Sequence, residues 1–135
     1  MMPAAALSIR IPAEAEQMAL VRAELADYGR AAGMNARGIE DAQTIVTEAC
    51  GNSIKHGYGD SAAGCLEIDA RAEDGELRIV IRDFGSGVGP RTASSLPGLH
   101  AGLAIIGALS DSFQLCSRRG AGTELEARLS LDAAA

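Results

Sequence analysis

The chain has 135 residues, of which 47% are hydrophobic and 3% aromatic, and its net charge is −6. This length fits one domain over residues 1–135 with a core of Ala, Leu, Ile and Val, and the acidic balance argues against a nucleic-acid partner, because phosphate binding draws on clustered Lys and Arg. No apolar stretch approaches a membrane span and no signal-peptide pattern is present, so we expect a cytoplasmic protein with no membrane partner.

The N-terminal half predicts one strand followed by two helices. Residues 6–12 alternate apolar and polar side chains as a half-buried strand does, and Pro12 ends the alternation. Over residues 14–33, apolar side chains recur every three or four positions, which indicates an amphipathic helix. The same spacing predicts a second helix over about residues 39–56.

The C-terminal half predicts four strands and one more helix. Residues 65–83 form two alternating runs joined at Asp74–Gly75, a favoured hairpin dipeptide. Glycine, serine and proline crowd residues 84–102 and predict a mobile loop, followed by a helix over residues 102–109. Residues 112–131 read as strand, glycine turn and strand. We therefore expect an α+β domain, a two-layer sandwich with three helices on one face of a mixed, mostly antiparallel sheet.

The three cysteines are Cys50, Cys65 and Cys116. Their odd number and wide spacing favour neither a disulfide framework nor a CxxC metal site. We expect them to be small buried thiols.

Glu48 and Asn52 lie one turn apart in the second predicted helix, at the border of its apolar face. A carboxylate there can accept a proton from a hydroxyl, or it can simply be a solvated charge at a partly exposed edge of the helix. The Asn52 oxygen can bind a hard cation such as Mg²⁺, which also takes waters and substrate phosphates as ligands. Since ExxxN occurs by chance in many helices, both interpretations stay open.

Asp83 ends a strong strand and is followed by Phe84, Gly85, Ser86 and Gly87. The aspartate can cap a turn, or it can accept a hydrogen bond from the exocyclic amine of a base while the glycines let the backbone approach the ring.

Two further glycine-rich stretches have both a structural and a functional interpretation. Residues 98–103, GLHAGL, lead into the third predicted helix, where backbone amides can form an anion site, or they form a simple loop. Residues 120–123, GAGT, are compatible with an ordinary hairpin turn.

In their order and spacing, these stretches resemble the Bergerat-fold ATPases shared by gyrase, the MutL repair protein and bacterial histidine kinases. The sequence TEACGNSIKHGYG is more narrowly similar to the anti-sigma-factor serine/threonine kinases. The resemblance covers nearly the whole chain and implies the Bergerat ATP-binding fold.

The resemblance also implies ATP and Mg²⁺ as cofactors, with Glu48 as the general base and Asn52 as the Mg²⁺ ligand. Asp83 would bind the adenine amino group, and Thr123 would form a hydrogen bond near the same base edge. The other implied nucleotide-binding residues are His56, Gly85, Gly87, Gly98, His100, Gly102 and Leu103.

These residues have different expected tasks. Gly85 and Gly87 would shape the pocket wall, whereas Gly98, Gly102 and Leu103 would belong to a lid that cradles the phosphates. His56 matches the HGY motif of the family, and we expect it to have a structural role. His100 stands where the family usually has a lid glycine, so its imidazole would either crowd the phosphates or contact them.

By this resemblance, we expect a protein serine/threonine kinase that binds a sigma factor and phosphorylates an anti-sigma-factor antagonist in partner-switching transcription control. The alternative is a Bergerat-fold module that sequesters a protein partner without phosphoryl transfer. Intact Glu48 favours the enzyme, and His100 favours the alternative. A homodimer is a further expectation from the family.

Overall fold

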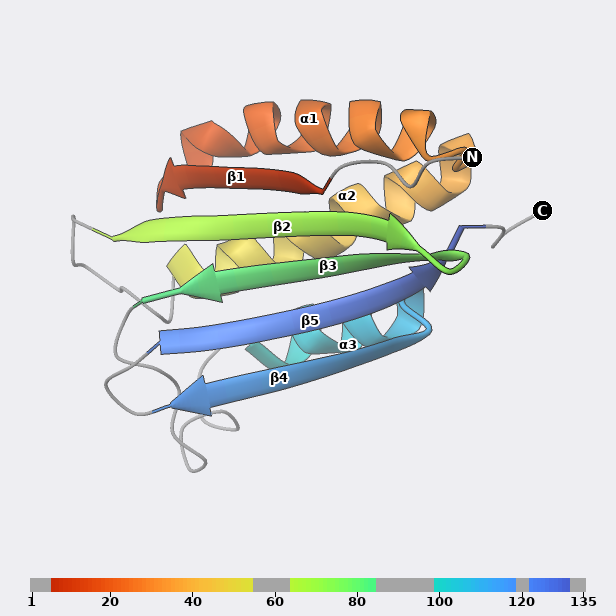
Figure 1. Ribbon diagram of the computed structural model, residues 1–135. Coiled ribbons are helices and arrows are strands. Elements are labelled where there is room, and N and C mark those ends of the chain that lie inside the picture. The colour runs from red at the N-terminus through yellow and green to blue at the C-terminus, as the bar shows by residue number, and fades with distance from the viewer. Residues whose placement is uncertain (1–5, 55–63, 85–98, 119–121, 132–135) are drawn as a thin grey trace.

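The computed structural model describes residues 6–54, 64–84, 99–118 and 122–131. In these residues five strands form one sheet in the order β1-β2-β3-β5-β4 (Figure 1). The strands are β1 Leu7–Pro12, β2 Cys65–Glu73, β3 Glu76–Asp83, β4 Ser112–Arg118 and β5 Gly122–Ser130. All the described pairings are antiparallel, so the α+β expectation is confirmed and the sheet is more regular than the mixed sheet expected.

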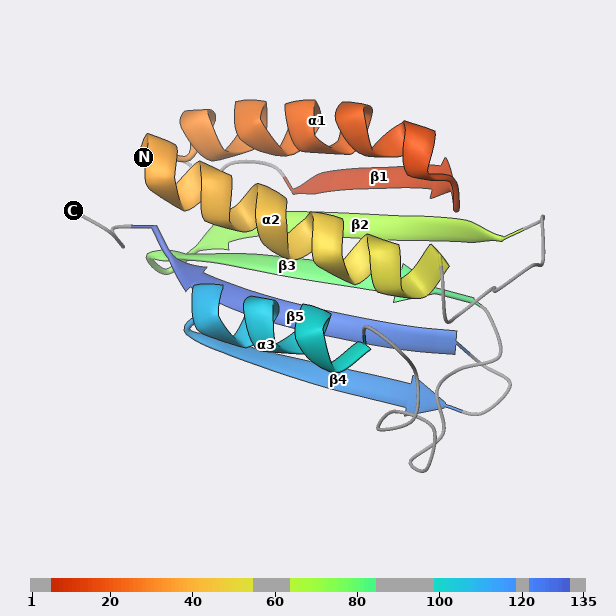
Figure 2. The same ribbon diagram turned by 180° about the vertical axis from the view of Figure 1, so that it is seen from behind.

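The helices cover one face of the sheet, as the two opposite views show (Figures 1 and 2). They are α1 Met18–Ala31, α2 Ala36–Asn52 and α3 Leu99–Leu109, with a short 3₁₀ turn over Ala15–Gln17 before α1. None of these described helices is long and apolar enough to cross a membrane.

The β2–β3 hairpin turns at Asp74–Gly75, as predicted. Both residues have positive φ angles, 54° and 79°. This is the left-handed backbone that two-residue hairpin turns require, and Asp and Gly tolerate it better than most residues.

Two helices begin three residues earlier than predicted. α2 begins at Ala36 because the Asn35 side chain accepts a 2.8 Å hydrogen bond from the Gly38 N–H and caps the helix. α3 begins at Leu99, so residues 99–101 are helical and not part of a loop. The first turn of α3 packs on α2 through Gly102, and this tertiary contact outweighs the low helix propensity of glycine.

The core lies between the helices and the sheet and consists of Leu, Ile, Val and Ala side chains, as the composition predicts. Its largest fully buried members include Leu25, Ile45, Leu66, Ile68, Leu77, Ile79, Ile81 and Ile106. Each such side chain contributes about 1.5–3 kcal/mol through burial, so the core supplies a rigid base for the sheet end.

The opposite face of the sheet carries charged side chains in cross-strand register. Arg82 donates to Asp69 at 2.7 Å and to Glu124 at 2.6 Å. These hydrogen bonds raise the pKa of Arg82. Arg10 continues the row with an ion pair to Glu67 at 3.1 Å. The charges therefore link β1, β2, β3 and β5 on the face that the helices leave uncovered.

Tyr28 connects α1 to the sheet. Its hydroxyl accepts a 2.8 Å hydrogen bond from the Ala72 N–H of β2. Among the described residues the pairing of β2 with β1 ends at Ala70, so this N–H lies beyond the described β1 ladder.

Candidate functional site

Polar side chains from the sheet and from the helices meet at one end of the molecule. β3 ends and β5 begins at this end, and the C-terminal end of α2 and the N-terminal end of α3 lie there too (Figures 1 and 2). We call Asp83, Gly122 and Thr123 the strand-end cluster, and Glu48, Asn52 and Gly102 the helix cluster.

The strand-end cluster is formed by the register of β3 with β5. Asp83 and Thr123 are direct cross-strand partners, and the Thr123 N–H donates to Asp83 Oδ1 at 3.1 Å. Asp83 is only 3% exposed, although it carries a carboxylate. A buried carboxylate needs hydrogen bonds, and a backbone N–H fixed in a sheet supplies one without any loss of side-chain freedom.

Gly122 allows β3 and β5 to approach each other at this point. Its φ of +92° lies in the left-handed region, and a Cβ built there would collide with the carbonyl oxygen of Asp83. The same Cβ would lie 2.9 Å from the Phe84 Cα. Only glycine combines this backbone angle with this approach, so Gly122 holds Asp83 and Thr123 in their present geometry.

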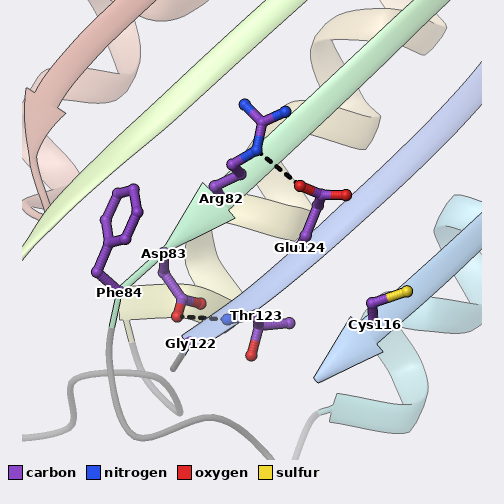
Figure 3. A pocket seen from close by; sticks show the side chains of 7 residues that line it. All are labelled: Arg82, Asp83, Phe84, Cys116, Gly122, Thr123 and Glu124. Atoms are coloured by element: carbon purple, nitrogen blue, oxygen red, sulfur yellow. Dashed lines mark hydrogen bonds and ion pairs between the residues drawn. The ribbon is translucent and has the colours of Figure 1, made fainter. Parts of the chain in front are cut away.

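A pocket of about 190 Å³ opens between the ends of β3, β5 and β4 (Figure 3). It is lined by Arg82, Asp83, Phe84, Cys116, Gly122, Thr123 and Glu124, so it includes charged side chains of the sheet face that the helices leave uncovered. The Thr123 Oγ1 is buried, yet it has no hydrogen-bond partner in the described part of the chain. An unsatisfied buried hydroxyl is costly in a folded protein, which makes this atom a candidate ligand contact.

Phe84 forms an exposed wall beside this pocket. It is 50% exposed, and the Arg10 guanidinium lies over its ring at 5.9 Å from the centroid. This cation–π contact ties the residue after β3 to the edge strand β1.

The helix cluster is formed by close contact between α2 and α3. A Cβ added to Gly102 would lie 2.8 Å from Asn52 Nδ2 and 3.3 Å from Glu48 Oε2. Glycine at position 102 therefore leaves the space that the two polar side chains occupy.

Glu48 and Asn52 are both half-buried, and in the described residues neither makes a hydrogen bond or an ion pair with its side chain. The carboxylate can accept a proton, and the amide oxygen can bind a hard cation. Among the described residues no three Asp, Glu, His or Cys side chains gather into a metal site. A cation here would therefore combine Asn52 with oxygens from a ligand and from water.

The structure brings together five of the residues singled out from the sequence, in two groups. Glu48 and Asn52 both lie within 3.4 Å of the position that a Cβ at Gly102 would take, and the Thr123 N–H donates to Asp83. Gly102 thus lies inside α3 and not in a lid loop, and Leu103 is half-buried against the core. His100 lies in the first turn of α3, but its side chain is outside the described residues. His56, Gly85, Gly87 and Gly98 lie wholly outside them.

Sequence reasoning missed three contributors to the site, namely Phe84, Cys116 and Gly122. Gly122 directly precedes Thr123, and this was the one available signal. The expectation of three buried cysteines is wrong, since Cys116 is exposed and Cys65 is partly exposed. Only Cys50 fits it, and burial raises the pKa of its thiol to about 12.

Comparison with known proteins gives a consistent result. A model of the histidine kinase-like ATPase domain matches residues 11–129. The chain is 30% identical over 127 residues to the serine-protein kinase RsbW of Bacillus cereus strain AH187, covering 84% of this chain and 79% of the relative. It is 33% identical over 90 residues to RsbW of Staphylococcus aureus strain JH9, covering 66% of this chain and 57% of that protein.

A solved structure has the same fold. The crystal structure of the RsbU and RsbW domains of a Mycobacterium tuberculosis protein superposes on 95% of this chain with a TM-score of 0.75 and 23% identity. This chain spans 33% of that longer chain.

Proposed function

Because the chain belongs to the histidine kinase-like ATPase family, we propose that it binds ATP with Mg²⁺ and phosphorylates a serine or threonine of a protein partner. The observation that carries this proposal is the position of Glu48 and Asn52, which lie without partners among the described residues at the same sheet end as the Asp83–Thr123 pair. Relatives named as serine-protein kinases support it.

The strand-end cluster fits an adenine ring. A carboxylate can accept several hydrogen bonds, so Asp83 can hold Thr123 and also receive the exocyclic amine of a base. The unsatisfied Thr123 hydroxyl lies beside it and can bond to the same base edge. The buried surroundings strengthen both interactions and select for a ligand with matching donors.

The helix cluster fits the reacting phosphate. Asn52 would hold Mg²⁺ together with phosphate oxygens and water, and the ion would neutralise charge on the phosphates. Glu48 would accept the proton of the acceptor hydroxyl. The acceptor oxygen then forms its bond to the γ-phosphorus as the bond to the β–γ bridging oxygen breaks, which leaves ADP. The chain thus contributes mainly positioning and one proton acceptor.

For the partners, we propose an anti-sigma-factor antagonist as the phosphate acceptor and a sigma factor as the protein that is released or held. The relatives named as serine-protein kinases support a serine of a protein as the acceptor, and the sigma factor and its antagonist follow from the family resemblance of the sequence motifs. A pure binding module with the same pocket would bind ATP and a partner but would transfer no phosphate.

Titration calorimetry with ATP, with and without Mg²⁺, tests the nucleotide site. Asp83→Asn keeps an oxygen for the Thr123 N–H but places an amide donor against the adenine amine, so we expect at least a tenfold loss of affinity. Asn52→Ala should remove most of the Mg²⁺ dependence. Asp74→Asn is the matched control, because it makes the same change in the hairpin turn, where Asn also tolerates a positive φ.

Incubation with γ-labelled ATP and a purified antagonist tests the transfer step. Glu48→Gln keeps the shape beside Gly102 but loses the proton acceptor, so phosphate on the antagonist should fall at least 100-fold while ATP still binds. Glu40→Gln makes the same change two turns earlier on the exposed side of α2 and should behave like the natural protein. ATP binding without any labelled antagonist would select the binding module.

A further inference from the structure

Gly51 is a helical glycine that the packing of the fold does not explain. Glycine inside a helix is less favourable than alanine, so a compensating contact is expected. Four of the five described helical glycines have one. A Cβ at Gly29 would lie 3.0 Å from Ile39, and a Cβ at Gly38 would lie 3.1 Å from Met34. In α3, a Cβ at Gly102 would lie 2.8 Å from Asn52, and a Cβ at Gly107 would lie 3.1 Å from Phe113. At Gly51 a Cβ would meet no described atom within 4 Å.

The position of Gly51 relates it directly to Glu48. At about 100° per residue, Asn52 lies about 40° from Glu48 around the helix axis, and Gly51 lies about 60° away on the other side. On the Asn52 side, α3 lies close by, because a Cβ at Gly102 would be 2.8 Å from Asn52 and 3.3 Å from Glu48. On the other side, a Cβ at Gly51 would meet no described atom within 4 Å, so Glu48 lies between a position packed on α3 and one with no described neighbour.

A base that transfers phosphate between two molecules needs access from two directions. The nucleotide phosphates would approach from the Asn52 side, which leaves the Gly51 side for the second reactant. A hydroxyl on a protein chain brings its own backbone and neighbouring side chains within a few ångströms of the base. A side chain at position 51 would occupy that space, whereas glycine leaves it open.

We infer that Gly51 is a specificity-determining residue, which admits the serine- or threonine-bearing segment of the protein acceptor to the Glu48 carboxylate. This inference rests on the proposed kinase function. It assigns to α2 a second task, since one flank of the helix serves the nucleotide and the other serves the acceptor.

Steady-state phosphorylation of a purified anti-sigma-factor antagonist from the same organism tests the inference. Gly51→Leu should raise the KM for the antagonist at least tenfold while the KM for ATP stays within twofold. Gly51→Ala should raise the antagonist KM about two- to threefold and should raise the melting temperature by about 3 °C, because alanine favours the helix. Ala108→Leu, which adds similar bulk on the exposed side of α3, is the matched control.

A second measurement separates binding from chemistry. The antagonist with its acceptor serine replaced by alanine should bind the natural protein in the presence of ADP and should bind Gly51→Leu at least tenfold more weakly. An unchanged antagonist KM in Gly51→Leu would overturn this inference and leave the kinase proposal intact. Loss of ATP affinity in Gly51→Ala and Gly51→Leu would also overturn it, because Gly51 would then serve the nucleotide site. Absence of transfer by the natural protein would overturn both proposals.

Discussion

The strand-end cluster and the helix cluster are built in opposite ways. In the first, Gly122 and the β3–β5 register fix Asp83 and Thr123, and a sheet hydrogen bond connects them. In the second, Glu48 and Asn52 lie close beside Gly102, and their side chains make no hydrogen bond or ion pair among the described residues. One half of the candidate site is thus preorganised by the backbone, while the other half keeps its polar groups available for ligands.

Gly122→Ala should have the largest effect on stability and on ATP binding, because it disrupts the rigid strand-end cluster. The new Cβ would meet backbone atoms of Asp83 and Phe84 that cannot move without opening the sheet. We expect a loss of about 3 kcal/mol or more in the free energy of unfolding, measured by urea denaturation, and loss of ATP binding.

Gly75→Ala separates the clash from the backbone angle. Gly75 also has a positive φ, 79°, but a Cβ there meets nothing described within 4 Å. We expect this variant to lose only about 1–2 kcal/mol. Equal losses in the two variants would show that the clash at Gly122 has no importance.

Gly102→Ala should affect activity more than stability. Its Cβ would meet the ends of the Asn52 and Glu48 side chains, which can rotate away, and alanine also favours the helix. We expect a change within about 1 kcal/mol in unfolding free energy but at least a tenfold slower phosphoryl transfer. Gly107 lies on the same helix as Gly102, and its added Cβ would meet Phe113 of β4. Gly107→Ala should therefore leave phosphoryl transfer unchanged.

Thr123→Val removes the unsatisfied Thr123 hydroxyl while keeping the shape of the side chain nearly constant. The backbone bond to Asp83 stays, so the unfolding free energy should change by less than about 1 kcal/mol. Calorimetry should show ATP affinity about fivefold weaker, since one ligand bond is lost. Thr123→Ser should retain the affinity, and an equal loss in both variants would contradict the role of the hydroxyl.

The smallest expected effect is a difference in the rate of thiol labelling between Cys50, which is buried in α2, and Cys116, which lines the pocket. Burial raises the pKa of Cys50 to about 12, so its reactive thiolate is scarce at pH 8 in the folded protein. Cys116 is exposed and lines the pocket. Mass spectrometry after iodoacetamide treatment should show Cys116 modified and Cys50 unmodified until urea unfolds the chain.

The raised Cys50 pKa also has a consequence for stability. The folded state holds this proton more tightly than the unfolded state, whose thiol has the ordinary value of 9.0. The stabilisation of the folded state by the protonated Cys50 thiol is therefore complete below about pH 9, and it is lost as the pH rises toward about 12. Cys50→Ala should remove that part of the alkaline decline.

Local patterns predicted most of the fold. Alternation identified the strands, and Asp74–Gly75 identified the hairpin, because both depend on neighbouring residues only. The helix starts were predicted less well. The Asn35 cap was visible in the sequence but overlooked, whereas the first turn of α3 depends on a tertiary contact between Gly102 and α2.

For the candidate site, the sequence points to residues only where a family motif marks them. The motifs identified Glu48, Asn52, Asp83 and Thr123 as candidates. No local pattern indicates that Gly122 approaches the backbone of Asp83 and Phe84, or that a Cβ at Gly51 would meet no described atom within 4 Å. Both properties arise only when strands and helices are assembled.

The Tyr28 hydroxyl also bears on how the molecule behaves in a crowded solution. In the described part of the chain β2 extends beyond the β1 ladder, and among these residues the Ala72 N–H has the Tyr28 hydroxyl as its acceptor and would otherwise be an open donor on a strand edge. Such donors recruit strands from other chains and start aggregation. By accepting that hydrogen bond, a side chain from α1 closes this edge, so Tyr28→Phe should leave the fold in place but shorten the time the protein remains monodisperse at high concentration.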